Sequence, residues 1–477
     1  MQGLRPQLLE GIPENVYDKI RQLEDSFVIG TPGLKKVTNH IVEELKKGLG
    51  VDGGDIPMNV TWVMGYPTGE ERGQYLTLDM GGTYLRVCDV VLAGRNESVQ
   101  LDQSKYKIPE NLQNAQADEL WDYVAECLRL FLLDRHPSEE EPIKMPLAFT
   151  FSYPVTQNSI RDGILQQWTK SLNVPEVVGK DVVTQLQAAL DRKKVQADIV
   201  ALVNDTTGTL IASAYHDPEI KIGSIISTGC NAAYMEEYGA IEKIEECSLP
   251  NDALIAINTE YGAFDNKRHV LPRTTYDENL DKLSPHPGCQ IYEKMVAGLY
   301  LGELLRLIFL ELHFQGALFA DQDISILKQP NVIDTSFLTI AEADVSESLR
   351  ELRQLCLEKL ALEPHPCDLK VCRYLVELIG TRAARLYACG IAAICKKRGF
   401  ERCHVGVDGA VFNHYPAFGK RASQALREVL DWPSGSEDLV TFHEAEDGSG
   451  IGAALIAALA VKRGGCGRLK PRAQKSN

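Results

Sequence analysis

Five short segments of the chain combine glycine with aspartate or threonine where a predicted strand ends or a predicted helix begins. They are residues 78–83, 203–209, 226–231, 406–410 and 446–452. Glycine lets backbone N–H groups approach a phosphate without a side chain in the way, and carboxylates and hydroxyls can bind metal ions or transfer protons. These residue types therefore permit phosphate binding combined with proton transfer.

Asp79 ends the predicted strand of the first segment. A turn follows, and an arginine lies on the returning strand (Gly81, Gly82, Thr83 and Arg86). In this arrangement Asp79 is placed to hold Mg²⁺ through water, and the Thr83 hydroxyl is placed to donate to a phosphate oxygen. The sequence Asp-x-Gly-Gly also occurs in ordinary tight turns that bind nothing. This segment alone therefore does not decide between phosphate binding and a structural turn.

Asp205 lies between the predicted strand 199–203 and the apolar run 210–215. A carboxylate at the end of a strand stands where α/β folds present reactive groups. The alternative is that Asp205 caps the helix that follows. This segment does not decide between a catalytic and a capping role.

The other three segments have the same character. Thr228 and Gly229 follow a predicted strand, Gly409 follows another, and Ser449 lies in a glycine-rich turn ahead of an alanine-rich run. Small residues at a helix N-terminus suit phosphate or nucleoside contact. For the last segment, a turn before a closely packed helix is the structural alternative.

Alternating strands and helices must position these segments. We predict strands at 75–79, 84–92, 145–152, 199–203, 224–227, 254–258 and 404–407, and helices at 15–49, 118–131, 181–190, 290–310, 344–360 and 369–398. Residues 51–71, rich in glycine and proline, are predicted as a loop. This order indicates an α/β fold with sheets covered by helices.

Composition narrows the classes of partner. The 477 residues carry a formal net charge of −16, which argues against nucleic acid or an anionic membrane as the main partner. No apolar run approaches the roughly 18–20 residues of a membrane span, so we expect no membrane insertion. The 12 cysteines show no zinc-ligand spacing and the N-terminus has no signal-like apolar core, which predicts reduced thiols in the cytoplasm.

Taken together, the order and the amino-acid sequences of the five segments resemble the nucleotide-binding signature of the hexokinase family. Further segments match almost word for word: residues 149–154, 168–170, 258–264, 284–303 and 381–386. The resemblance extends from about residue 15 to about residue 463, and it is strongest to fungal glucokinases and hexokinases of single-unit size.

This resemblance implies a two-lobed actin-like ATPase fold of the ribonuclease H-like type, with a cleft between a large and a small domain. It places residues 1–66 and 207–445 in the large domain. Residues 67–206 and 446–477, with a C-terminal helix, form the small domain. It implies a monomer or a homodimer.

The implied activity is ATP-dependent phosphorylation of the 6-hydroxyl of glucose, the first step of glycolysis, with Mg²⁺; other hexoses remain open as substrates. Asp205 is the implied general base, and Lys170 neutralises the transferring phosphoryl group. The implied sugar site is Ser152, Thr169, Lys170, Asn204, Asp205, Asn231, Glu260, Gln290 and Glu293. The implied ATP and metal site is Asp79, Gly81, Gly82, Thr83, Arg86, Thr228, Gly229, Gly409 and Ser449.

Structural alternatives exist for the charged members. The structural alternative for Lys170 is a solvated surface lysine, and for Glu260 and Glu293 it is simple surface acids. The glycine, alanine and phenylalanine that follow Glu260, and the methionine close to Glu293, are too apolar for a solvent-facing strip, which favours the site.

The chain departs from the family pattern near the phosphates, at Tyr84, Ser227 and Ala410, and at Tyr261 behind the sugar site. Ser227 adds a side chain where backbone approaches phosphate, which predicts altered ATP affinity. The competing hypothesis is a glucose-sensing regulatory homologue that closes on glucose but transfers phosphate poorly.

Overall fold

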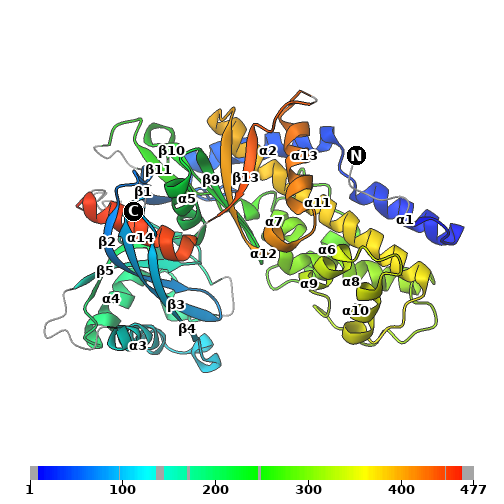
Figure 1. The fold of residues 1–477 in the computed structure, drawn as a ribbon, viewed down its shortest axis with the longest axis horizontal. Helices are drawn as coiled ribbons and strands as arrows, with labels where there is room; N and C mark the ends of the chain where they lie inside the picture. The colour runs from blue at the N-terminus through cyan, green and yellow to red at the C-terminus, as the bar shows by residue number, and fades with distance from the viewer. Residues whose placement is uncertain are drawn as a thin grey trace, which may run out of the picture.

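A computed structural model describes residues 9–95, 97–135, 144–168, 172–244, 249–433, 435–445 and 447–464. It contains two large β-sheets, each with helices packed against it (Figure 1). The six-stranded sheet has the order β1-β11-β10-β9-β12-β13, and the five-stranded sheet has the order β4-β3-β2-β5-β8. The α/β fold class expected from the sequence is confirmed, and the predicted strand–turn–strand motifs fall within these sheets.

The five-stranded sheet is built from residues before the catalytic candidate Asp205. Its strands are β2 (Arg72–Met80), β3 (Tyr84–Ala93), β4 (Gln100–Lys107), β5 (Met145–Phe151) and β8 (Ala197–Val203). Successive side chains of a strand point to opposite faces. Leu76 and Leu78 therefore belong to the core under α3 (Ala117–Arg135) and α4 (Val182–Arg192), whereas Tyr75 belongs to the core on the other face.

The six-stranded sheet combines strands from both ends of the chain. They are β1 (Asn59–Met64), β9 (Ile220–Ile226), β10 (Cys230–Glu237), β11 (Leu254–Asn258), β12 (Cys403–Asp408) and β13 (Val440–Glu444). The strands β1, β11, β10 and β9 are antiparallel neighbours, and β12 is parallel to both β9 and β13. The carboxyl ends of β9 and β12 therefore meet at one edge, which brings Thr228 and Gly409 to the same end of the sheet.

Helices build the rest of this half of the molecule, on the right in Figure 1. They are α1 (Glu14–Phe27), α2 (Thr31–Gly50), α6 (Thr275–Leu283), α7 (Ile291–Val296), α8 (Gly298–Phe314), α9 (Thr335–Ala343), α10 (Arg350–Leu360), α11 (Pro366–Arg398), α12 (Ala410–His414) and α13 (Phe418–Val429). Among the described residues α11 is the one helix with the length and hydropathy of a membrane span. Because 94% of its apolar window is buried inside the fold, it has the character of a core helix.

Several predicted elements differ from the observed ones. The predicted helix over 15–49 is two helices, because Pro32 in the first turn of α2 cannot continue the preceding helix. The predicted helix over 290–310 is interrupted at Ala297, whose backbone is extended. The predicted loop over 51–71 contains β1, which becomes a strand by pairing with β11, a partner about 190 residues away.

Two helices lie between the sheets. They are α5 (Asp205–His216) and α14 (Ala453–Lys462), and both contribute to the larger of the two hydrophobic core clusters. The helix α14 contacts β2, β5 and β8, and α5 contacts β9 and β10. The predicted limits of the large and small domains stay a prediction.

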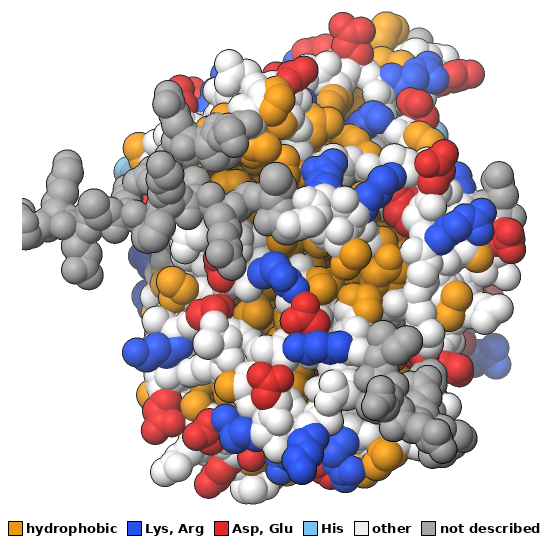
Figure 2. All heavy atoms as spheres, turned by 90° about the vertical axis from the view of Figure 1, so that its left-hand side faces the viewer, with side chains coloured by type: hydrophobic (Ala, Val, Ile, Leu, Met, Phe, Trp, Pro, Cys, Tyr) orange, Lys and Arg blue, Asp and Glu red, His pale blue; other side chains and the backbone are white. Residues whose placement is uncertain are grey.

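The face of the molecule that carries the five-stranded sheet shows Lys and Arg side chains interspersed with Asp and Glu (Figure 2). No broad area of one charge is visible on this face. Among the described residues visible on this face, no extended basic surface of the kind that binds nucleic acid is found.

A buried ion pair joins α6 to α11. The guanidinium of Arg382 donates to both carboxylate oxygens of Asp277 at 2.7 and 2.8 Å, and the two side chains are 1% and 4% exposed. Burial alone raises the pKa of Asp277, but the charge of Arg382 and its hydrogen bonds outweigh this and lower that pKa below its ordinary value. Arg382 also lies over the ring of Phe27, which ties α1 to the same pair.

We expect Asp277→Asn to lower the free energy of unfolding at pH 7 by about 3–5 kcal/mol, because it leaves the buried Arg382 charge without its partner. A depressed pKa contributes stability above the unfolded value near 4, and this contribution is lost as the pH falls through the folded value. The gap between the two proteins should therefore narrow below about pH 4. Urea unfolding from pH 7 to pH 3 measures it, and Asp431→Asn, which breaks an exposed pair with Lys35, should cost less than about 1 kcal/mol. A gap independent of pH would contradict the role of this charge.

Candidate active site

Asn204, and not Asp205, caps the helix α5. The Asn204 side chain accepts hydrogen bonds from the backbone N–H groups of Thr206 and Thr207 at 2.9 and 3.3 Å. Asp205 is the first residue of the helix, and its Oδ1 accepts from the Thr206 N–H at 2.7 Å. The capping role considered for Asp205 therefore belongs to its neighbour. The carboxylate of Asp205 is held at a positive helix end, and the described residues donate no hydrogen bond to its Oδ2.

A glycine crossing fixes the position of α5. A Cβ on Gly208 would lie 2.3 Å from the carbonyl oxygen of Gly448, and one on Gly452 would lie 2.1 Å from that of Gly208. Gly448 and Gly452 bound the π-helical turn (Gly448–Gly452) that leads into α14. Only glycine permits this approach, so the turn containing Ser449 is held directly against the helix that begins with Asp205.

Asn231, Asn258 and Glu260 form a hydrogen-bonded group at the ends of β10 and β11. The Asn231 amide donates to Asn258 Oδ1 at 2.7 Å and to Glu260 Oε1 at 3.0 Å, and the Asn258 amide donates to the same Glu260 oxygen at 2.8 Å. Asn231 Oδ1 accepts from the Glu260 N–H at 3.0 Å. Glu260 has a left-handed backbone, with φ 54°, an uncommon conformation for a glutamate that this network supports.

Glu293 on α7 lies in the same region. Gln290, the residue directly before α7, also contributes to it. Glu293 Oε2 accepts from the backbone N–H of Cys230 at 2.9 Å, next to Asn231. Gln290 also has a left-handed backbone, and its buried Oε1 has no partner among the described residues. A buried acceptor without a donor costs free energy, so this oxygen is suited to accept from a ligand hydroxyl.

The turns expected to hold phosphate meet at one place. The Ser227 N–H donates to the Gly229 carbonyl at 2.9 Å, closing the turn between β9 and β10. Gly409 has φ 122°, and a Cβ there would lie 2.4 Å from the Ile226 carbonyl oxygen. Glycine at 409 is therefore required for β12 to approach this turn.

Arg86 is paired with an acidic residue of the C-terminal turn. Its guanidinium engages both oxygens of Asp447, and one of its nitrogens lies 3.4 Å from Ser449 Oγ. Across the β2–β3 pair, Arg86 is opposite Asp79. Asp79, Arg86 and Ser449 are thus brought to one place by elements more than 350 residues apart.

Asp408 lies close to two other aspartates. Withdrawal from water raises its pKa above the ordinary value, and the negative charges of Asp447 and Asp205 raise it further. These carboxylates therefore come close enough to interact electrostatically at the junction of α5, β12 and the C-terminal turn. Such a junction has a negative field that favours a bound cation.

The remaining predicted residues divide into two groups. Thr169 and Lys170 lie outside the described residues. Ser152 directly follows β5, and Gly81, Gly82 and Thr83 form the turn between β2 and β3. Asn258 beside the site was not among the predicted site residues, and Asp408 and Asp447 were predicted only as members of the segments 406–410 and 446–452. For Asn258 a usable signal existed, because it occupies a strand end two residues before Glu260.

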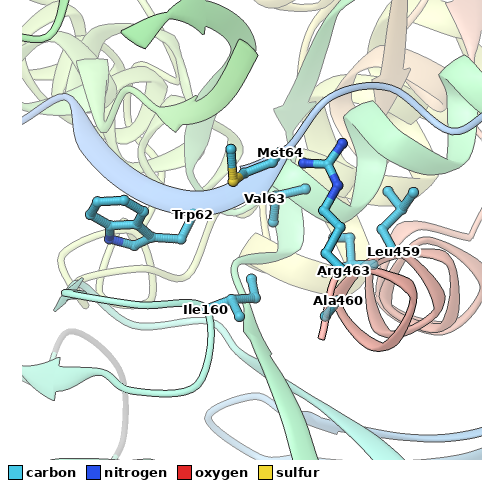
Figure 3. Close-up of a pocket in the computed structure, with 8 residues that line it drawn as sticks. Trp62, Val63, Met64, Ile160, Leu459, Ala460 and Arg463 are labelled. Carbon is cyan, nitrogen blue, oxygen red and sulfur yellow. The ribbon is translucent and has the colours of Figure 1, made fainter. Parts of the chain in front are cut away.

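A separate small pocket, with a volume of about 20 Å³, lies between β1 and the end of α14 (Figure 3). Trp62, Met64, Ile160 and Leu459 are among its apolar lining residues, and Arg463 reaches its rim. It is lined by none of the predicted site residues. The predicted sugar and nucleotide residues therefore lie outside this pocket, and their roles stay a prediction.

Comparison with known proteins places this geometry in context. Two family models described as hexokinase match residues 19–215 and 221–459. A hexokinase of Emericella nidulans is 51% identical over 457 residues, covering 95% of this chain and 93% of that protein. Hexokinase-1 of Saccharomyces cerevisiae is 47% identical, covering 96% of each chain.

Among solved structures, the chain is similar to the hexokinase of Schistosoma mansoni complexed with glucose. The TM-score is 0.85 at 34% sequence identity, and the alignment covers 93% of this chain and 99% of the other. The similarity therefore extends over both sheets and over the helices between them.

Proposed function

Because this chain belongs to the hexokinase family, we propose that it transfers the terminal phosphoryl group of ATP to the 6-hydroxyl of glucose. The observation that carries the proposal is the Asp205 carboxylate at the start of α5, because this helix packs against β10 and β11, which carry the polar group, and against the glycine turn that precedes α14. This transfer requires a proton acceptor, a surface whose polar groups can hydrogen-bond a sugar, and turns that can bind phosphate.

In the proposed reaction Asp205 accepts the proton of the sugar hydroxyl. The hydroxyl oxygen then forms a bond to the γ-phosphorus while the bond to the β-phosphate oxygen breaks, and ADP leaves with that electron pair. Lys170 is proposed to balance the charge of the transferring group. Little covalent chemistry is left to the protein, so positioning and electrostatic stabilisation supply most of the rate.

Glucose is proposed to be held by a ring of paired polar groups. The hydrogen-bonded group of Asn231 and Glu260, with Glu293 beside it, supports this assignment, and the buried Oε1 of Gln290 offers one more acceptor. Ser152, Asn204 and Thr169 complete the proposed ring. A sugar hydroxyl left without a partner would cost its desolvation, which gives such a ring its selectivity.

ATP is proposed to lie over Gly81, Gly82, Thr83, Thr228, Gly229, Gly409 and Ser449. Mg²⁺ prefers oxygen ligands and keeps several waters, and the carboxylate of Asp79 at the end of β2 suits such a water-mediated contact. When bound, Mg²⁺ would neutralise phosphate charge. The pairing of Arg86 with Asp447 supports a role for Arg86 in holding the C-terminal turn beside the phosphates.

We propose that this protein is located in the cytoplasm, a reducing compartment. Ten cysteines in the described part of the chain are free, and eight of them are buried. Unpaired thiols in this number support an environment that keeps thiols reduced.

Steady-state formation of glucose 6-phosphate with ATP and Mg²⁺ tests the proposed function. We expect turnover of the order of 1–10³ s⁻¹ on glucose, with fructose and mannose measured beside it to define the substrate class. A rate no faster than that of Asp205→Ala, with glucose binding retained, would support the regulatory homologue instead.

A further inference from the structure

Asp217, His404 and His443 form a cluster at the end of α5 opposite to Asp205. One ligand atom from each lies within 4.8 Å of the others. None of the three belongs to the proposed sugar or nucleotide site. Their side chains are accessible, since His443 is exposed and the other two are about one-third exposed.

The fold brings these residues together from three elements. Asp217 is the C-cap of α5. His404 lies on β12 and His443 on the neighbouring parallel strand β13, where His443 is opposite Gly406. Both histidines therefore point to the same face of the sheet.

Gly406 explains why the helix end reaches the histidines. A Cβ at this position would lie 2.3 Å from Ser213 Oγ, so the absent side chain lets α5 pack directly on β12. The carboxylate that ends α5 consequently lies next to the first histidine. His404 Nδ1 and Asp217 Oδ2 are 2.5 Å apart.

The second histidine completes the cluster. The rings of His404 and His443 are stacked with their centroids 4.2 Å apart, and His443 Nε2 lies 2.8 Å from Thr441 Oγ1. Asp217 Oδ1 accepts from the Glu219 N–H at 2.9 Å, which holds the carboxylate while leaving Oδ2 toward the histidines.

We propose that Asp217, His404 and His443 bind a divalent transition-metal ion of the zinc class, with water as the fourth ligand. Two imidazole nitrogens and one carboxylate oxygen are a donor set that suits zinc and not the all-oxygen preference of Mg²⁺. Ligand atoms on a tetrahedral zinc are about 3.4 Å apart. The ion would therefore replace the direct contact of 2.5 Å between His404 Nδ1 and Asp217 Oδ2, and the exposed His443 would rotate toward it.

A metal here would join the C-terminal end of α5 to β12 and the edge strand β13. Asp205 lies at the other end of this 12-residue helix, about 18 Å away at 1.5 Å per residue. The ion would therefore stabilise the frame that carries the proposed base, without contact with the reacting groups.

Zinc binding to the full chain, measured by calorimetry without nucleotide, tests the proposal. All proteins carry Cys289→Ser, because the exposed Cys289 thiol is a competing zinc ligand. We expect one equivalent of zinc to bind and to raise Tm by about 2–5 °C at saturation, while Mg²⁺ at the same concentration does not. His404→Ala and His443→Ala should each weaken binding at least about tenfold.

His216→Ala is the matched control, since His216 is an exposed histidine next to Asp217 and outside the cluster. It should keep the zinc affinity and the Tm shift. Cobalt supplies a second readout, because Co²⁺ at the site should give visible absorption bands of tetrahedral intensity that both cluster variants lose while circular dichroism shows them folded. Equal zinc binding by the parent and both variants, or equal loss in His216→Ala, would overturn the proposal.

Discussion

Asp205→Asn is expected to lower kcat for glucose phosphorylation by about 10²–10⁴-fold, because an amide cannot accept the hydroxyl proton. The amide oxygen can still accept from the Thr206 N–H, so the start of α5 should be unchanged. Coupled spectrophotometric assays give kcat, and calorimetry without ATP gives the glucose affinity, which should stay within a few-fold of that of the parent.

Asp181→Asn provides the matched control for this substitution. Asp181 caps α4 by accepting from Val183 and Thr184, so the same change from carboxylate to amide is made at another helix start, outside the proposed site. It should leave kcat within about twofold. Retention of full activity by Asp205→Asn would exclude this residue as the general base.

Gly208→Ala is expected to be the most disruptive single methyl addition to the framework of the site. The new methyl would fall 2.3 Å from the Gly448 carbonyl oxygen, inside the contact between α5 and the π-helical turn. Overpacking of this kind typically costs about 1–3 kcal/mol, which exceeds the gain of up to about 1 kcal/mol from replacing helical glycine by alanine. Because Asp205 lies one turn away, we also expect kcat to fall by at least about tenfold.

Gly50→Ala controls for the gain in helix propensity. Gly50 ends α2, and a Cβ there would meet only Glu242 Oε2, at 3.6 Å. Its Tm should be equal to that of the parent or slightly higher. If Gly208→Ala behaves in the same way, with an unchanged Tm and kcat, the crossing is looser than the structure indicates.

Local patterns in the sequence predicted the strands and turns that present the site. The apolar run before Asp205 and the glycines after Asp79 are local signals, and the structure places β8 and the β2–β3 turn there. The same is true of β12 before Gly409. Where a strand is defined by its own apolar residues and ended by glycine, sequence alone was sufficient.

Long-range contacts account for the elements that sequence reasoning missed. The strand β1 has a weak local pattern and forms through pairing with β11, which lies about 190 residues away. The pairing of Arg86 with Asp447 joins residues separated by 361 positions. No local pattern carries such information, and the nearest guide was the family resemblance.

The choice between base and cap at Asp205 shows the same limit. Both Asn204 and Asp205 have side chains that cap helices, and sequence rules do not say which one starts the helix. In the structure Asn204 is the cap, because its side chain accepts two hydrogen bonds from backbone N–H groups of α5. One residue of register separates a structural role from a chemical one.

The position of α14 has a consequence for the nascent chain. The five-stranded sheet is complete once β8 has been made, but its face carrying Tyr75 and Val90 is covered by α14, about 250 residues later. At 5–20 residues per second, a ribosome needs about 12–50 s to reach that helix. During this interval the part of this face that α14 covers stays exposed, so the early half of this protein should depend on chaperones until α14 emerges.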